Sequence, residues 1–228
     1  MNKIIPSFLT LFTLVLLSAC KYDSAAPIRD IRFDPKLLGR LQTEGSSACT
    51  NHFFNDKGKI KNLGTISPEF VLIAFKNDLN AEGRLKVVER FGFVEGIVSQ
   101  ASSRSAMLYT LRLMSGLNCR QAEQAIKELS SDAAVQYAAP YFVQVVNGRT
   151  LLTGISNELL VKIEQTDAAS FNRLSKDYNA DLVSASDDNS YLLKVDKTSK
   201  GNALETANYL NKQNNVELAS PEFIVTPF

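Results

Sequence analysis

The sequence predicts an α+β fold in which a β-α-β-β-α-β unit occurs twice. Apolar alternating runs and runs of helical period follow one another in the same order in residues 67–148 and 155–228. The last strands of the two units share the pattern Val-x-x-Ala-x-Pro-x-Phe. The composition, 45% hydrophobic and 21% charged over 228 residues, is globular and allows one large domain or two small ones.

The chain opens with a targeting sequence. After Lys3, the apolar run from Ile4 to Leu17 is shorter than the ~20 residues that a transmembrane helix needs, and it ends in Leu17-Ser18-Ala19-Cys20. This ending resembles the lipobox of bacterial lipoproteins. The resemblance implies cleavage of residues 1–19 and lipid attachment at Cys20, and hence anchoring to a bacterial membrane of the cell envelope. We expect the outer membrane, with its side left open; the alternative is an ordinary signal peptide followed by a chance cysteine.

Two short segments precede the first unit. Residues 20–50 contain several small residues and two prolines, Pro27 and Pro35, with little apolar periodicity, which predicts a tether. In residues 51–66, the turn-forming Asn55-Asp56-Lys57-Gly58 separates an aromatic pair from an alternating run. This pattern predicts a lead-in hairpin.

Each unit begins with a β-rich apolar run and continues with a helix. The two runs are Glu69–Phe75 and Glu158–Ile163, after the lead-ins Ser67-Pro68 and Ser156-Asn157. Apolar residues at helical spacing follow: Leu85, Val88 and Phe91 in the first unit, and Phe171, Leu174 and Tyr178 in the second. Each helix is closed by a turn-forming residue, Gly92 or Asn179.

Two strands, a second helix and a last strand complete each unit. The paired strands are expected at 94–99 and 107–113, joined by the polar loop 99–105, and at 181–185 and 191–195. The second helices begin after favourable N-cap residues, Asn118 and Asn202. The order is that of the split βαβ, or ferredoxin-like, unit, an antiparallel sheet with both helices on one face. We therefore predict two such domains, 67–148 and 155–228.

The last strand of the second unit carries the most specific motif, Ala219-Ser220-Pro221-Glu222-Phe223. This motif looks like the Ala-Glu-Pro-Asn/Asp-Phe strand that closes the propeptides of subtilisin-like serine proteases. Segments such as Tyr191-Leu192-Leu193-Lys194-Val195 follow the family order across nearly the whole second unit. The second unit thus resembles these propeptides, which are peptidase-inhibitor domains. The first unit matches more weakly, because Ala139 stands where the family tends to be acidic.

In that family, the propeptide packs its sheet against two surface helices of the protease, assists its folding, and lays its C-terminal tail in the substrate cleft. The resemblance implies a protease inhibitor or folding chaperone, and not an enzyme. The implied tail is Val225, Thr226, Pro227 and Phe228, with Phe228 as the anchor. Glu222 would cap the N-terminus of a protease helix. The alternatives are a solvated turn carboxylate at Glu222 and a frayed chain end at Phe228.

Other chemistry finds little support. His52 is the only histidine, so no Ser-His-Asp or Cys-His arrangement is available, and the sequence holds no phosphate-binding glycine loop. No paired metal-ligand spacing occurs, and Asp187-Asp188 supplies too few oxygens for calcium. After removal of residues 1–19, which carry Lys3, 24 basic residues face 24 acidic ones. We therefore expect no cofactor, no metal and no nucleic-acid partner.

Cys49 and Cys119 could pair in an oxidising compartment. One precedes the first unit and the other starts its second helix, so the sequence leaves both the paired and the free state open.

The leading hypothesis is a membrane-anchored lipoprotein that binds a subtilisin-like serine protease. The second unit would be the active module and the first a spacer or second site. The alternative is a non-catalytic structural or assembly lipoprotein of the cell envelope that uses the fold for other interactions. A third hypothesis is a propeptide that remains after the loss of its protease domain.

Overall fold

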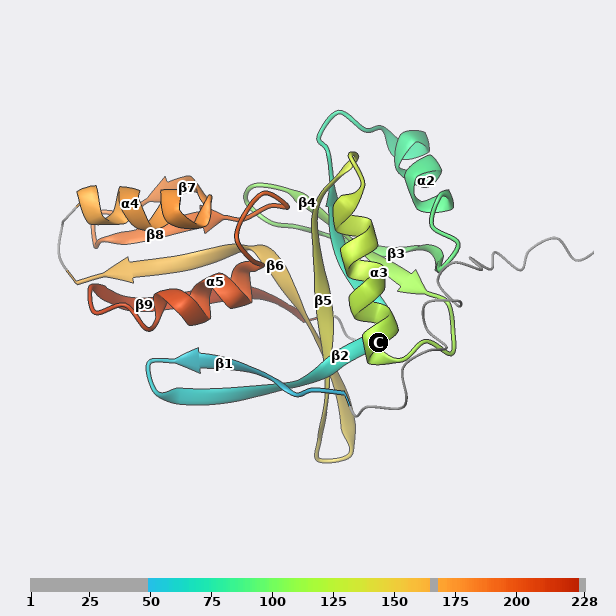
Figure 1. The fold of residues 1–228 in the computed structure, drawn as a ribbon, viewed down its shortest axis with the longest axis horizontal. Helices are drawn as coiled ribbons and strands as arrows, with labels where there is room; N and C mark the ends of the chain where they lie inside the picture. The colour runs from blue at the N-terminus through green and yellow to red at the C-terminus, as the bar shows by residue number, and fades with distance from the viewer. Residues whose placement is uncertain (1–48, 165–167, 226–228) are drawn as a thin grey trace, which may run out of the picture. The chain divides into compact units, whose positions relative to one another are not determined.

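The computed structural model describes residues 49–164 and 168–225 (Figure 1). These residues lie in one compact unit, Asp34–Phe228. Cys20, most of the expected tether, and the tail residues Thr226, Pro227 and Phe228 lie outside the described residues. Within the described part of the chain, no helix is both long and apolar enough to cross a membrane.

One strand, β1, is followed by two rounds of strand, helix, strand, strand, helix and strand. The strands are β1 His52–Asp56, β2 Lys59–Phe75, β3 Val94–Ser102, β4 Met107–Leu113, β5 Val135–Val146, β6 Arg149–Ile163, β7 Asp181–Ala185, β8 Ser190–Lys194 and β9 Val216–Val225. The helices are α2 Ala81–Glu89, α3 Cys119–Ser131, α4 Ala168–Tyr178 and α5 Ala203–Leu210. We call β2 to β5 the first repeat and β6 to β9 the second repeat.

One nine-stranded antiparallel sheet runs through both repeats, in the order β3-β4-β2-β5-β6-β8-β7. In addition, β1 pairs with β2, and β9 pairs with β6. Within the repeats, the strand orders are therefore β5-β2-β4-β3 and β9-β6-β8-β7, each the order of a ferredoxin-like unit. The repeats are thus joined through their backbones and are more than neighbours on a linker.

The joint between the repeats is the β5–β6 hairpin. Its two-residue turn, Asn147-Gly148, has positive φ at both positions (51° and 73°), the geometry that suits the twist of paired strands. Beyond the turn, the two strands pair from Val146 opposite Arg149 to Tyr141 opposite Gly154. A Cβ atom on Gly154 would lie 2.8 Å from the Tyr141 ring, so the absence of a side chain lets the two strands close together.

The helices pack in equivalent ways in the two repeats. In the first, α2 lies against β3, and α3 against β2 and β5; in the second, α4 lies against β7, and α5 against β6 and β9. Both α3 and α5 start with a capping box, in which Asn118 or Asn202 binds the third helical residue reciprocally. One hydrophobic cluster includes residues of both repeats. The buried Tyr137 hydroxyl also donates to the carbonyls of Ile155 and Ser156, across the repeat boundary.

The β1 strand connects the two repeats. It pairs with β2 of the first repeat and also bonds to α5 of the second. The Asn55 backbone amide donates to Asn208 Oδ1 in α5 (2.8 Å), and Nδ2 of Asn211, the residue after α5, donates to the Asn55 carbonyl (2.7 Å). Asn211 also bonds both backbone groups of Ala219 in β9. In residues 51–66, where the sequence predicts a lead-in hairpin, β1 pairs with the first part of β2. The strand β2 then runs unbroken from Lys59 into the first repeat, because its early part pairs with β1 and its later part with β4 and β5.

Candidate functional site: the open sheet face and the bulge of the second repeat

One face of the second repeat is partly open to solvent. Along β6, Leu159 and Val161 are buried, whereas Leu160 between them is 43% exposed. Because neighbouring side chains in a strand point to opposite faces, Leu160 lies on the side away from the helices. It pairs with Leu192 in β8 and Ser220 in β9, and Lys162 pairs with Leu218. We call the side that carries Leu160, Lys162, Leu192, Leu218 and Ser220 the open face.

The same face of the first repeat is filled. Leu72 pairs with Thr110 and Ala139, the positions equivalent to Leu192 and Ser220. Leu72 is 1% exposed, Thr110 2% and Ala139 0%. The two repeats therefore differ in accessibility, and only the second presents this face to solvent.

Both repeats carry an irregularity where their first and last strands meet. In the second repeat, Ser156 to Glu158 bulge from β6 between the Ile155–Phe223 and Leu159–Pro221 pairs. Glu158 is the last residue of this bulge on β6, and Glu222 is the residue opposite the bulge on β9.

The first repeat has an aromatic pair at the same place. Phe70 and Tyr141 occupy the positions of Glu158 and Glu222, with ring centroids 6.3 Å apart in an edge-on arrangement. The sequence comparison sets Glu69 against Glu158, which is wrong by one residue. The first repeat has one more residue in its bulge, so strand pairing sets Phe70 there instead.

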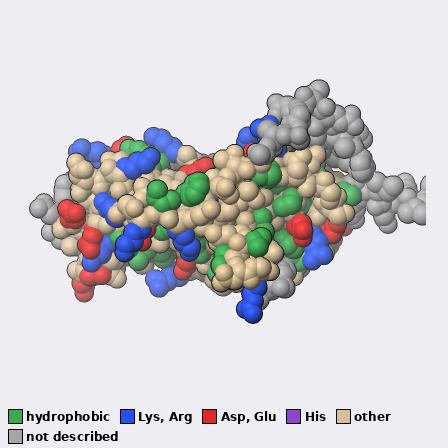
Figure 2. All heavy atoms as spheres, turned by 90° about the horizontal axis from the view of Figure 1, so that it is seen from below, with side chains coloured by type: hydrophobic (Ala, Val, Ile, Leu, Met, Phe, Trp, Pro, Cys, Tyr) green, Lys and Arg blue, Asp and Glu red, His purple; other side chains and the backbone are tan. Residues whose placement is uncertain are grey.

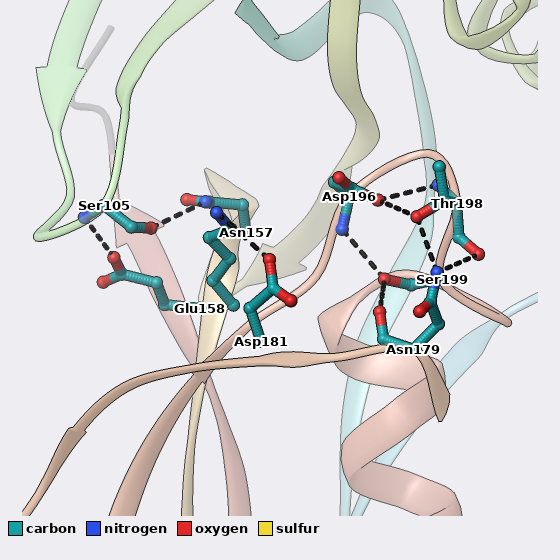
Figure 3. Close-up of polar contacts among 9 residues, drawn as sticks. Ser105, Asn157, Glu158, Asn179, Asp181, Asp196, Thr198 and Ser199 are labelled. Atoms are coloured by element: carbon teal, nitrogen blue, oxygen red, sulfur yellow. Dashed lines mark hydrogen bonds and ion pairs between the residues drawn. The ribbon is translucent and has the colours of Figure 1, made fainter. Parts of the chain in front are cut away.

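The β3–β4 loop of the first repeat is seated on this bulge (Figure 3). The backbone amides of Arg104 and Ser105 donate to the two Glu158 carboxylate oxygens, at 3.2 and 2.5 Å. Asn157 accepts from the Ser103 hydroxyl and donates to the Ser105 hydroxyl, both at 3.0 Å. The sequence predicts a loop at 99–105, but β3 extends to Ser102, because it pairs with β4 as far as Met107.

The two carboxyl groups of the bulge have opposite electrostatic settings. Burial of Glu158 opposes its ionisation, but hydrogen bonds from Ser105 and Arg104 outweigh burial and hold its pKa below the ordinary value. The pKa of Glu222 is raised, first by partial desolvation and then by the Glu158 carboxylate, although Arg104 acts in the other direction. Glu158 is therefore the ionised acceptor for the loop, while Glu222 is exposed on the open face.

Two ion pairs lie elsewhere in the sheet of the second repeat. Lys194 contacts Asp181 at 3.2 Å, and Lys162 contacts Glu217 at 3.3 Å. A separate polar cluster among Asn179, Asp196 and Thr198 braces the β8–α5 connection (Figure 3). Figure 2 shows charges of both signs among small apolar patches on the face it presents, in agreement with the balanced composition.

The structure places two of the five expected protease-binding residues. Glu222 lies beside the bulge, and Val225 ends β9 with 69% of its side-chain surface exposed. The sequence did not identify Asn157 and Glu158 as site residues: it placed Asn157 in the lead-in and Glu158 at the start of the strand. Three successive polar residues before an apolar run, Ser156-Asn157-Glu158, were the available signal.

Cys49 and Cys119 are not among the residues of this site. Cys49, just before β1, and Cys119, the first residue of α3, form a disulfide with their Cα atoms 5.9 Å apart. No cluster of three or more histidine, cysteine or acidic side chains suited to a metal occurs among the described residues. Asp188 accepts a hydrogen bond from Ser190 in the β7–β8 turn.

The second repeat is thus an antiparallel module with the strand order of a ferredoxin-like unit and with one sheet face open to solvent. Residues 153–222 match the family described as the fervidolysin N-terminal prodomain, which is of the subtilisin-like propeptide kind. This match begins in β6 and ends at Glu222 in β9, so it covers the second repeat.

The other comparisons add no functional argument. A search of curated proteins finds no match. The chain is similar to the acetolactate synthase small subunit from Thermotoga maritima at 13% identity, over 70% of this chain and 98% of that chain. The TM-score of 0.28 is too low to show a common fold.

Proposed function

We propose that the second repeat binds a subtilisin-like serine protease as a propeptide-type inhibitor or folding chaperone. The similarity of residues 153–222 to a protease prodomain supports this role. A prodomain acts by binding its protease, so the proposed role is non-catalytic.

The observation that carries the proposal is the contrast between the equivalent Leu160 and Leu72, which are 43% and 1% exposed. A sheet face that packs against a partner must be accessible before binding. The open face meets this condition, while the same face of the first repeat is used inside the molecule. We therefore assign protease binding to the second repeat and a supporting role to the first.

We extend the proposal to the segment that follows the open face. β9 ends at Val225, and an extended segment leaving a strand can add to the edge of a substrate cleft. Val225, Thr226, Pro227 and Phe228 would follow the cleft, with Phe228 in a pocket. Glu222 would accept hydrogen bonds from the N-terminus of a protease helix, since its exposed carboxylate lies on the same strand.

We further propose that the protein acts at a membrane of the cell envelope through lipid on Cys20. The Leu17-Ser18-Ala19-Cys20 ending supports the anchor, and the Cys49–Cys119 disulfide suits an oxidising compartment. Metabolic labelling with a radioactive fatty acid tests this part, because Cys20→Ala should abolish the label.

Inhibition of a panel of subtilisin-like proteases by the soluble protein from Lys21 to Phe228 tests the main proposal. Leu160→Asp should weaken inhibition strongly, because it puts a charge at the centre of the open face. Leu85→Asp is the matched control, since Leu85 is similarly exposed, at 51%, on α2 of the first repeat. A version without 225–228 should lose inhibition if the tail enters the cleft.

The outcomes separate the hypotheses. Equal inhibition by the Leu160→Asp and Leu85→Asp variants would exclude the open face as the binding surface. No inhibition and no assisted refolding of any protease by the unsubstituted protein would refute the proposal. An assembly role in the cell envelope would then be the better account.

A further inference from the structure

We infer that the junction of the two repeats forms a binding pocket for a basic side chain, arginine or lysine, of a partner polypeptide. The pocket has a volume of about 410 Å³ and lies between the β3–β4 loop and the end of β9. The site draws on both repeats, and it does not require the partner to be a protease.

The walls of the pocket suit a long side chain with a charged end. One wall is polar and comes from Ser102, Ser103 and Ser156, while Phe223 and Ile224 supply apolar surface. Glu222 lines the same pocket. Arginine and lysine carry an apolar stem that packs on hydrophobic surface and a cationic head that seeks carboxylate and hydroxyl oxygens.

The loop wall is fixed in place before any ligand arrives. Glu158 holds the backbone of Arg104 and Ser105, and Asn157 holds the hydroxyls of Ser103 and Ser105. A pocket wall held by four hydrogen bonds needs little ordering when a ligand binds, which favours affinity.

The charges at the pocket favour a cation over an anion. Glu222 and Arg104 are the charged residues of the lining. The buried Glu158 carboxylate does not line the pocket, but it interacts with Glu222 and so adds a second negative group beside it. The pKa of Glu222 is raised first by desolvation and then by the neighbouring Glu158 carboxylate, while Arg104 acts in the other direction. A bound cation would relieve this repulsion, whereas a bound anion would add to it.

Nuclear magnetic resonance titration of the soluble protein with Nα-acetyl-L-arginine amide tests the inference. We expect saturable shifts of the Ser103, Glu222 and Phe223 amide signals. Nα-acetyl-L-citrulline amide, which is nearly isosteric but neutral, should cause no saturable shift. Nα-acetyl-L-glutamic acid amide serves as the anionic probe and should also fail to bind.

Two surface substitutions give opposite expected results. Glu222→Gln should raise the dissociation constant of the arginine probe by about threefold or more, because it removes the exposed ion pair. Arg104→Gln should lower that constant by about twofold, because it removes a competing cation. Both residues are exposed, so neither substitution should unfold the protein.

The inference is overturned if the arginine probe causes no saturable shift, or if citrulline binds as well as arginine. Binding of the glutamate probe that is lost in Arg104→Gln would show an anion site instead. These results are independent of protease inhibition, so failure here would leave the proposed function standing.

Discussion

Removal of the Cys49–Cys119 disulfide should destabilise the protein strongly. The bond joins residues 70 apart in the sequence and so closes a long loop in the unfolded chain. In the chain-entropy model, a loop of this length corresponds to about 4 kcal/mol of stabilisation at 25 °C. The soluble protein from Lys21 lacks Cys20, so these are its remaining cysteines and no other pairing competes.

The effect should be largest around β1. The disulfide ties the residues before β1 to α3 of the first repeat, and Asn55 ties the strand to Asn208 and Asn211 near α5 of the second. Without the disulfide, β1 keeps its bonds to β2 and to the second repeat but loses its attachment to α3. Hydrogen exchange of the β1 amides should therefore accelerate more than that of β6.

Urea unfolding followed by circular dichroism measures the magnitude. With a denaturant dependence of about 2 kcal/mol per molar, a loss of about 4 kcal/mol lowers the urea midpoint by about 2 M. The thermal midpoint should fall by about 10 °C or more for a chain of this size. The Cys49→Ala/Cys119→Ala variant and the reduced unsubstituted protein should agree, apart from the packing lost when the buried Cys119 sulfur is removed.

The reasoning is refuted if the reduced protein keeps a midpoint within about 0.3 M of the oxidised protein, since the entropic term would then be absent. A large loss in the double alanine variant without a matching loss on reduction would assign the effect to packing at Cys119.

The bulge and two turns give further predictions. Glu158→Gln should destabilise the protein by about 2 kcal/mol at pH 7, because an ionised acceptor of two backbone amides is lost. The pKa of Glu158 is lowered by folding, so this contribution is present above the unfolded-state pKa and is lost as the pH falls through the folded-state pKa. The urea midpoints of variant and parent should therefore converge as the pH falls through that range. Glu222→Gln should have the opposite sign: the raised pKa means that the carboxylate opposes folding at neutral pH, so the variant should be more stable at pH 7 and equal to the parent below the unfolded-state pKa. Gly64→Ala should destabilise by about 3 kcal/mol, because φ is +84° and the new Cβ would collide with a β5 carbonyl, whereas Gly58→Ala, at φ +92° in open space, should lose about 1 kcal/mol by thermal unfolding. Asn211→Ala should lower the thermal midpoint by several degrees, because it leaves buried backbone groups of β9 and β1 without their partners.

Local patterns were sufficient to predict the order of elements. The N-cap residues Asn118 and Asn202 and the paired prolines Pro140 and Pro221 mark equivalent points of the two repeats, and short-range chemistry determines both features. The match of residues 153–222 to a prodomain family agrees with the resemblance seen in the second unit.

The features that depend on long-range packing could not be predicted in the same way. Leu72 and Leu160 occupy equivalent strand positions with the same side chain, yet one is buried and the other exposed. The difference arises from what lies over each face, which no local pattern encodes. The role of Glu158 as the acceptor for the β3–β4 loop has the same origin, since its partners lie more than 50 residues away.

The shared strand pairing between β5 and β6 has a consequence for how the molecule comes apart. Loss of either repeat would leave the backbone groups of the other unpaired along the β5–β6 seam and would open the common hydrophobic cluster. Partial unfolding is therefore penalised on both sides of the seam. Both repeats should therefore unfold in a single cooperative transition. A destabilising substitution in the core of the first repeat should then also remove binding at the open face of the second repeat, although it changes no residue of that face.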